Sequence, residues 1–189
     1  MSLPTSLIDQ SWTLFLDRDG VINRHRPNDY VKCIAEFEFL PSVPEAMARL
    51  AGIFGRIIVV TNQQGIGKGL YTAAELETIH AHMLRDIEGA GGRIDRIYFC
   101  PQLEMDRSPM RKPGIGMALK AREDFPEICF AKSIMVGDSA QDIEFGYRAG
   151  MYAVLIRADL DDPASRLPVD ATYPSLAALA DSLVGEISR

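Results

Sequence analysis

Two aspartates separated by a single residue follow the first apolar run of the chain. Residues 13–16 (Thr-Leu-Phe-Leu) lead directly into Asp17, Arg18, Asp19 and Gly20. Side chains two residues apart in an extended chain point the same way, so both carboxylates can act at one place. One carboxylate can attack phosphorus if a cation screens the repulsion between the two anions, and its neighbour can transfer protons. A lone Asp-x-Asp also occurs in solvated turns and helix caps.

Polar residues that suit a phosphate group follow a second apolar run. Thr61 and Asn62 come after residues 57–60 (Ile-Ile-Val-Val), and their hydroxyl, amide and backbone N–H groups can bind a phosphate. Lys112 follows Arg111 and precedes a proline that opens a helical pattern, where a cation could neutralise phosphoryl oxygens. Each pattern also has an ordinary explanation, because Thr and Asn often end strands and Arg-Lys pairs often lie in solvated loops.

Two more acids stand at the end of another strand pattern. Asp138 follows residues 134–137 (Ile-Met-Val-Gly), and Asp142 comes four residues later in the first turn of a predicted helix. Hard oxygen ligands at strand ends are typical of a magnesium site. Asp142 could instead serve only the helix dipole.

The elements that must position these residues form a βα pattern. Short β-branched runs alternate with amphipathic segments, which predicts an open parallel sheet with helices on both faces. The predicted strands are 13–16, 56–61, 94–100, 133–137 and 152–156, and the predicted helices are 43–54, 73–89, 115–124, 141–149 and 175–187. Residues 158–172 read as an irregular connection. Since ligands bind at the carboxyl ends of such strands, the loops 23–39, 62–71 and 101–113 should build the pocket.

Length and composition favour a single domain over residues 1–189, with its core at about 13–157 and a C-terminal helix at about 175–187. The net charge of −6 and the pI near 5.1 argue against nucleic acid as a partner. Three scattered cysteines, no export signal and no membrane-length apolar run favour a cytoplasmic protein without a membrane partner. The oligomeric state stays open, with a monomer favoured.

In their order, the motifs resemble those of the haloacid dehalogenase (HAD) superfamily. The resemblance runs from about Thr13 to Arg157 and rests on Asp-x-Asp-Gly-Val, Thr-Asn, Lys and Gly-Asp-x-x-x-Asp. Residues 17–23, 61–66, 100–101 and 111–113 are similar to bacterial heptose 1,7-bisphosphate phosphatases and the related histidinol-phosphate phosphatases. The resemblance implies a Rossmann-like, HAD-like α/β fold. The motif spacing leaves room for no cap domain.

The resemblance also implies a role for each matching residue. Asp17 would be the nucleophile that forms an aspartyl phosphate, and Asp19 the general acid and then the base. Mg²⁺ would be held by Asp17, the main-chain carbonyl of Asp19 and Asp138, with Asp142 orienting these ligands or binding through water. To work in this way Asp19 must be neutral when substrate binds while Asp17 is ionised.

Substrate contacts follow from the same comparison. Thr61, Asn62 and Lys112 would bind the transferring phosphoryl group, with Gln63 among the substrate-binding residues, and Arg111 is the best candidate for a second anionic group. Sugar hydroxyls could meet the side chains of Asn23, Arg24, His25 and Gln64. The expected partner is a small phosphate ester, first D-glycero-D-manno-heptose 1,7-bisphosphate at C7, with histidinol phosphate as the alternative.

Members of this group commonly carry a structural zinc bound by Cys-Pro-His and a later Cys-x-Cys. Here Cys100 remains, but Gln102, Ser108 and Met110 stand at the other positions. One thiolate cannot hold a tetrahedral zinc, so we predict none.

Three other classes of protein share parts of this pattern. A response-regulator receiver also uses strand-end acids, a Thr and a Lys, but there the phosphorylated Asp follows a central strand and the Lys comes last, whereas here Lys112 precedes Asp138. A binding-only relative would need a missing catalytic group, and all are present. A nucleic-acid 3′-phosphatase would need a basic patch. His80 and His82 do not share a helix face, and both read as surface or core residues.

Overall fold

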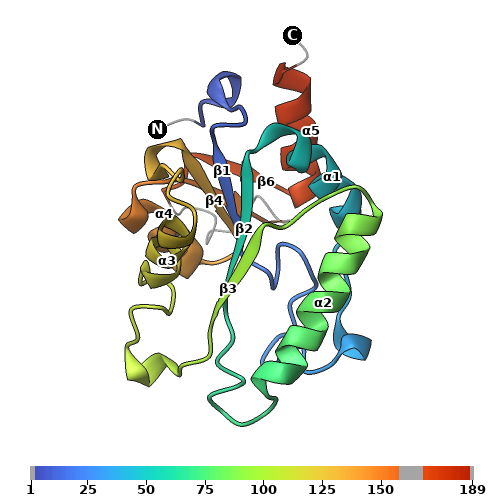
Figure 1. Ribbon diagram of the computed structural model, residues 1–189, viewed down its shortest axis with the longest axis vertical. Helices are drawn as coiled ribbons and strands as arrows, with labels where there is room; N and C mark the ends of the chain where they lie inside the picture. The colour runs from blue at the N-terminus through green and yellow to red at the C-terminus, as the bar shows by residue number, and fades with distance from the viewer. Residues whose placement is uncertain (1–2, 158–167, 188–189) are drawn as a thin grey trace.

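The computed structural model describes residues 3–157 and 168–187, which are built around one parallel sheet (Figure 1). Its strands are β1 (Thr13–Leu16), β2 (Arg56–Asn62), β3 (Arg96–Cys100), β4 (Ser133–Gly137), β5 (Tyr152–Ile156) and β6 (Ala171–Tyr173). The strand order is β3-β2-β1-β4-β5-β6, and every neighbouring pair is parallel. The predicted α/β class with an open parallel sheet is confirmed.

Helices cover both faces of this sheet. They are α1 (Val43–Ile53), α2 (Ala73–Gly89), α3 (Gly116–Asp124), α4 (Ala140–Ala149) and α5 (Leu176–Ile187). Short 3₁₀ turns occupy Thr5–Leu7, Ile34–Glu36, Glu104–Asp106 and Phe130–Lys132. Figure 1 shows α1, α2 and α5 on one side of the sheet and α3 and α4 on the other. Both helical layers agree with the expectation from the sequence.

Alternation along the strands divides the core between the two faces. Leu14 and Leu16 pack with α1, α2 and α5, whereas Phe15 between them packs with α3 and α4. The register repeats this division, because Leu14 pairs with Ile57 and with Ile134 in the neighbouring strands. A strand buried on both faces has no polar side, and this is why β1 and β4 read as continuous apolar runs.

Two helices begin with reciprocal capping. Thr72 accepts a hydrogen bond from the backbone N–H of Glu75, whose carboxylate accepts one from the Thr72 N–H, and α2 starts there. Ser139 and Asp142 form the same arrangement at the start of α4. Such capping satisfies N–H groups that have no partner within the helix, so the start of α4 is fixed at the sheet edge where Asp138 lies.

β6 was not among the strands predicted from the sequence. Its three residues, Ala-Thr-Tyr, are half-buried at the sheet edge and form no apolar run, so nothing marks them as a strand. Of the predicted irregular connection 158–172, residues 158–167 lie outside the described part, and its end belongs to β6. β3 starts at Arg96 rather than 94, after Asp95 has accepted a hydrogen bond from the Ile57 backbone.

The chain reverses its direction of travel across the sheet between β1 and β4. From β1 it moves outward through β2 and β3, and from β4 it moves outward on the other side through β5 and β6. Crossover loops therefore leave β1 and β4 in opposite directions and open a crevice at their carboxyl ends. Among the described residues, no helix combines the length and apolarity needed to span a membrane.

Candidate active site

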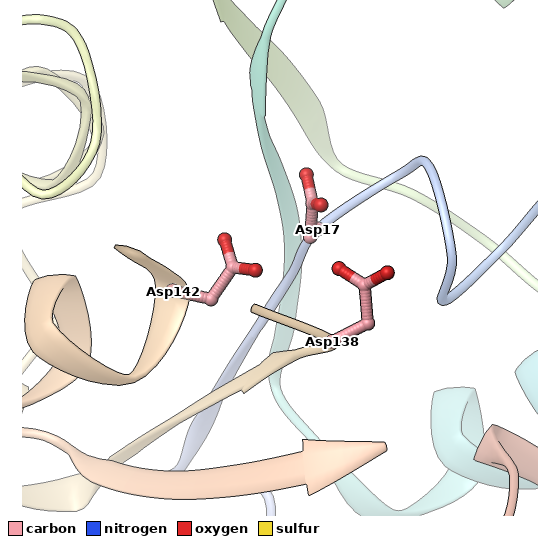
Figure 2. Close-up of side chains that lie close together, drawn as sticks. All are labelled: Asp17, Asp138 and Asp142. Atoms are coloured by element: carbon pink, nitrogen blue, oxygen red, sulfur yellow. The ribbon is translucent and has the colours of Figure 1, made fainter. Parts of the chain in front are cut away.

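Three carboxylates meet at this crevice. Asp17 follows β1, Asp138 follows β4 and Asp142 lies in the first turn of α4, and one oxygen from each falls within 4.8 Å of the others. Figure 2 shows the three side chains grouped around the same space. The Asp17 N–H donates to the Val136 carbonyl at 2.9 Å, which continues the β1–β4 pairing up to the cluster. The sheet itself thus sets the spacing of the acids.

Two glycines make room for these acids. Gly20 has φ of +89°, and a Cβ built on it would lie 1.9 Å from Oδ2 of Asp138. A Cβ on Gly137 would lie 2.0 Å from the Cβ of Asp142. A side chain at either position would therefore displace a carboxylate of the cluster.

Lys112 is the cation of the cluster. Its Nζ lies 2.7 Å from Oδ1 of Asp17 and 2.5 Å from Oδ1 of Asp142, and the residue is 3% exposed. Burial by itself lowers the pKa of Lys112, but Asp142 and Asp17 outweigh it and hold that pKa above the usual value. Lys112 is therefore charged at neutral pH.

One ammonium does not balance three carboxylates. Burial raises the pKa of Asp17 to about 8, with Lys112 opposing and neighbouring acids adding to the rise. Burial and then Asp142 raise the pKa of Asp138 to about 6, with His25 and Lys112 opposing. Close oxygen donors with excess negative charge fit a hard divalent cation, which would relieve the repulsion that raises these pKa values. The Asp142 carboxylate already accepts hydrogen bonds from Lys112 and Ser139, so Asp17 and Asp138 are more available as ligands of the cation.

The other predicted phosphate-binding residues lie beside Lys112. Asn62 accepts a hydrogen bond from the Lys112 N–H at 3.0 Å and donates to its carbonyl at 3.2 Å. Its amide also donates to Gln141 Oε1 at 3.2 Å. Thr61 comes just before Asn62 in β2 and also lines the cavity. Asn62 therefore links the end of β2 to the Lys112 loop and to α4.

Asp19 also lines the cavity, and its carboxylate accepts hydrogen bonds from three neighbouring side chains. Its two oxygens each accept from Nη2 of Arg18 at 2.9 Å, and they also accept from Asn23 and Gln63 at 2.9 Å. Burial by itself raises the pKa of Asp19, but the Arg18 charge and these hydrogen bonds hold it below its usual value. This is the reverse of the expected order of proton affinities, because Asp17 carries the raised pKa and Asp19 the lowered one.

Gln63 lies outside the cavity wall on which we expected it. It is buried, donates to Thr61 Oγ1 at 2.8 Å as well as to Asp19, and accepts from the Tyr71 hydroxyl at 2.6 Å. Its role in this structure is to support Asp19 and Thr61 rather than to face a ligand. The polarity of the residue suggested a substrate contact, and only the tertiary structure shows the direction of its side chain.

Arg18, Tyr71 and His80 belong to the same buried layer, and none of the three was predicted from the sequence as a site residue. Arg18 is 1% exposed and lies 3.2 Å from Nε2 of His80 through Nη1. A signal for His80 did exist, because it lies on the apolar stripe of α2 with Leu76, Ile79, Met83 and Ile87. For Arg18, the interruption of a buried run by an arginine was the only hint.

The carboxylates open into a cavity of about 440 Å³. Its wall includes His25, Arg26, Asp29 and Tyr30 from the loop after β1. Of the expected sugar contacts, His25 is in this wall, with Nδ1 3.9 Å from Asp138 Oδ2. Asn23 instead donates to Asp19, and Arg24 pairs with Glu38.

Arg111 is in the wall of an adjoining cavity of about 320 Å³. Lys112 and Gln141 line both cavities, and Arg107 and Arg148 line the second one with Arg111. Nη1 of Arg111 is buried and has no hydrogen-bond partner among the described residues. A basic hollow thus lies directly beside the acidic one.

Cys100 ends β3, where relatives would begin a zinc site. It is buried, and burial raises the pKa of its thiol. Its Sγ lies 3.1 Å from Oε1 of Gln102, and the Met110 N–H donates to Ser108 Oγ at 3.2 Å. The residues that replace the zinc ligands thus form local hydrogen bonds within this loop. The absence of zinc stays a prediction, which metal analysis of the purified protein can check.

The fold and the acidic crevice define the class of HAD-like hydrolases. A family model described as HAD-hydrolase-like matches residues 109–182. A D-glycero-α-D-manno-heptose-1,7-bisphosphate 7-phosphatase of Mycobacterium bovis is 37% identical over 166 residues, covering 87% of each chain. A D-glycero-β-D-manno-heptose-1,7-bisphosphate 7-phosphatase of Pseudomonas putida is 33% identical over 174 residues, and the match covers 90% of this chain and 98% of that relative.

A solved structure agrees with these relatives. The D,D-heptose 1,7-bisphosphate phosphatase of B. bronchiseptica, crystallised with magnesium and phosphate, is 32% identical with a TM-score of 0.84, covering 93% of this chain and 99% of its own. The chain therefore belongs to the HAD-superfamily phosphatases, in the family that contains the D-glycero-D-manno-heptose-1,7-bisphosphate 7-phosphatases.

Proposed function

We propose that this phosphatase removes the 7-phosphate of D-glycero-D-manno-heptose 1,7-bisphosphate through a phosphoenzyme on Asp17. The observation that carries the mechanism is the Asp17–Lys112–Asp142 arrangement beside Asp138 at the crevice. The substrate is inferred from relatives that cover nearly the whole chain and are named for this sugar. Histidinol phosphate, the alternative, is not favoured by those names.

A magnesium ion fits the donor set, with Asp17, Asp138 and the Asp19 carbonyl as its proposed ligands. The observation in favour is the excess of closely spaced carboxylates and the space that Gly20 leaves beside Asp138. When bound, such an ion supplies charge that screens the phosphate from Asp17 and polarises its oxygens. Asp142 holds Lys112 and caps α4, and so keeps the lysine directed at the phosphate.

Asp17 is the nucleophile of the first step. One of its oxygens forms a bond to phosphorus while the bond from phosphorus to the sugar oxygen breaks. Asp19 gives its proton to that sugar oxygen, and the dephosphorylated sugar leaves. Thr61, Asn62 and Lys112 bind the phosphoryl oxygens, where backbone and ammonium donors stabilise the developing charge.

Water completes the cycle. Its oxygen bonds to phosphorus, the bond to Asp17 breaks, and Asp19 takes the proton that the water loses. The three side chains that donate to Asp19 favour this ionised, accepting form. Its protonation before the first step is assisted by the substrate dianion, because a nearby negative charge raises the pKa of a carboxyl group.

Arg111, Arg107 and Arg148 are proposed to meet the second phosphate of the substrate. Their hollow shares Lys112 and Gln141 with the catalytic cavity, so a bisphosphate can reach both. Arginine binds phosphate through two parallel N–H donors, and in the described part of the chain the buried Nη1 of Arg111 has no partner. The proposed single domain and cytoplasmic location stay predictions.

A phosphate-release screen tests the proposal. The purified protein with Mg²⁺ is given both anomers of the heptose bisphosphate, other sugar mono- and bisphosphates, and histidinol phosphate, with Asp17→Asn as the blank for contaminating phosphatases. We expect the highest kcat/KM for one heptose bisphosphate anomer and release of one phosphate per sugar. A higher kcat/KM for histidinol phosphate, or for a monophosphate, would reject the proposed substrate.

A further inference from the structure

A buried arginine lies directly beneath the candidate acid of the site. Arg18 is 1% exposed, and its Nη2 donates to both carboxylate oxygens of Asp19 at 2.9 Å. A guanidinium has five N–H donors in a rigid fork, so its orientation fixes the orientation of whatever it holds. The direction of the Asp19 carboxylate therefore depends on how Arg18 itself is held.

Arg18 is held by His80 of α2. Its Nη1 lies 3.2 Å from Nε2 of His80, and this pair spans 62 residues of sequence. A guanidinium cannot accept a hydrogen bond, so Nε2 must be the acceptor and the ring must be neutral. Burial, and then the Arg18 charge, lower the pKa of His80 to about 3, in agreement with a neutral ring. His80 is itself fixed among the buried residues of α2.

The remaining donors to Asp19 come from the loops of the crevice. Asn23 donates to one oxygen, and Gln63, which accepts from the Tyr71 hydroxyl, donates to the other. Those loops follow β1 and β2 at the carboxyl edge of the sheet. Among the side-chain hydrogen bonds that Arg18 makes with the described residues, only the one to His80 reaches a helix.

We propose that His80 is a positioning residue for Asp19: by accepting a hydrogen bond from Arg18, it holds the guanidinium that directs the Asp19 carboxylate toward the reacting oxygen. His80 touches neither substrate nor the reacting atoms. The inference rests on the proposed role of Asp19 as acid and base. Through this contact α2, which contributes no residue to the cavity wall, takes part in the reaction.

Two substrates with different leaving groups distinguish a positioning role of His80 from a general structural effect of its substitution. A sugar alkoxide needs a proton as it leaves, whereas p-nitrophenolate is a stable anion that leaves without one. kcat/KM reports the steps up to formation of the phosphoenzyme, in which Asp19 acts as the acid. A misdirected Asp19 therefore lowers kcat/KM for the sugar ester selectively, while damage to Lys112 or the metal ligands lowers it for both esters.

The variants are His80→Leu, which removes the acceptor, and His80→Gln, whose Oε1 can take the place of Nε2. His82→Leu on the same helix is the matched control. We expect His80→Leu to lower kcat/KM for heptose 1,7-bisphosphate by about 10- to 100-fold and for p-nitrophenyl phosphate by about threefold at most. His80→Gln should restore both values to within about threefold, and His82→Leu should change neither.

If His80→Leu does not fold, His80→Asn replaces it, because its shorter side chain keeps an amide but not the reach to Arg18. Equal losses on both esters, or no loss on the sugar ester, would overturn the proposal. Asp19→Asn is measured in the same assay: if it shows no selective loss, the proposed role of Asp19 fails. If Asp19→Asn is selective and His80→Leu is not, only the positioning role of His80 is wrong.

Discussion

The side-chain amide of Asn62 forms hydrogen bonds with both the N–H and the carbonyl of Lys112, at 3.0 and 3.2 Å, across 50 residues of sequence. This pair joins the end of β2 to the loop that carries the buried cation. With its backbone held in this position, Lys112 places its Nζ against Asp17 and Asp142. Asn62 is thus important to the site even before it meets a phosphate.

Asn62→Ala should reduce activity chiefly through Lys112. Loss of both hydrogen bonds leaves the Lys112 backbone without its partner, so we expect kcat/KM to fall by about 10- to 100-fold and the free energy of unfolding to fall by about 1–2 kcal/mol. Steady-state kinetics and urea denaturation measure the two effects. Glu77→Ala, at an exposed position of α2 outside the cavity wall, is the control. A decrease in activity no greater than that of the control would contradict this role.

Asp17→Asn should abolish turnover without loss of stability. The amide keeps the shape but lacks the nucleophilic charge, and an acid-stable phosphoprotein should be absent after rapid quench. Because burial raises the pKa of Asp17 to about 8, its contribution to stability is full below about pH 4 and is lost as the pH rises toward 8. In EDTA near neutral pH the variant should therefore have a Tm at least equal to that of the parent. Activity within tenfold of the parent would refute the covalent role.

Magnesium should stabilise the protein more at high pH than at low pH. The metal competes with protons for Asp138, whose pKa is raised to about 6, and for Asp17, whose pKa is raised to about 8. At about pH 5 both are protonated, and at about pH 8.5 neither proton blocks the ion, so the rise in Tm on adding Mg²⁺ should grow between these limits. Differential scanning fluorimetry at matched ionic strength measures it. A pH-independent rise would contradict binding at these two acids.

Arg111→Ala should discriminate between substrates with one and two phosphates. Loss of a charged partner is worth about 1.5–3 kcal/mol, so kcat/KM for heptose 1,7-bisphosphate should fall about 10- to 100-fold. p-Nitrophenyl phosphate should be affected much less, because Arg111 lines the adjoining cavity and not the catalytic one. Arg96→Ala, on an exposed strand position, is the control. Equal losses on both esters would place Arg111 at the transferring phosphate.

Sequence patterns predicted the five longer strands and all five helices because each carries a local signal. β1 and β4 are buried on both faces and read as apolar runs, and α2 and α4 begin with capping residues. β6 has no such signal, since three half-buried residues at a sheet edge depend on their neighbour β5. β6 therefore forms through its tertiary pairing with β5 and not from a local sequence signal.

The candidate site divides in the same way. Asp17, Lys112 and Asp138 could be proposed from sequence because each stands next to a strand or helix signal, and these elements bring the three to one edge of the sheet. The direction of a polar side chain carries no such signal. Gln63 was therefore expected at the substrate, and Arg18 and His80 were not recognised, although the three form one buried layer around Asp19.

Gly20→Ala should remove the metal site by contact rather than by backbone strain alone. A Cβ at this position would lie 1.9 Å from Oδ2 of Asp138, so this carboxylate must leave its place in the cluster. Gly69→Ala is a matched control, because Gly69 also has a positive φ, +72°, but no atom of the described residues lies within 4 Å of a Cβ built there. Both variants should lose about 1 kcal/mol of stability from the left-handed backbone.

Only Gly20→Ala should lose the stabilisation that Mg²⁺ gives. We expect its rise in Tm with saturating Mg²⁺ to fall close to zero and its activity to drop at least about 100-fold, whereas Gly69→Ala keeps both within about threefold of the parent. Fluorimetry with and without the ion, followed by phosphate release, measures the pair. If Gly20→Ala responds to Mg²⁺ like Gly69→Ala, Asp138 does not bind the ion at the position proposed.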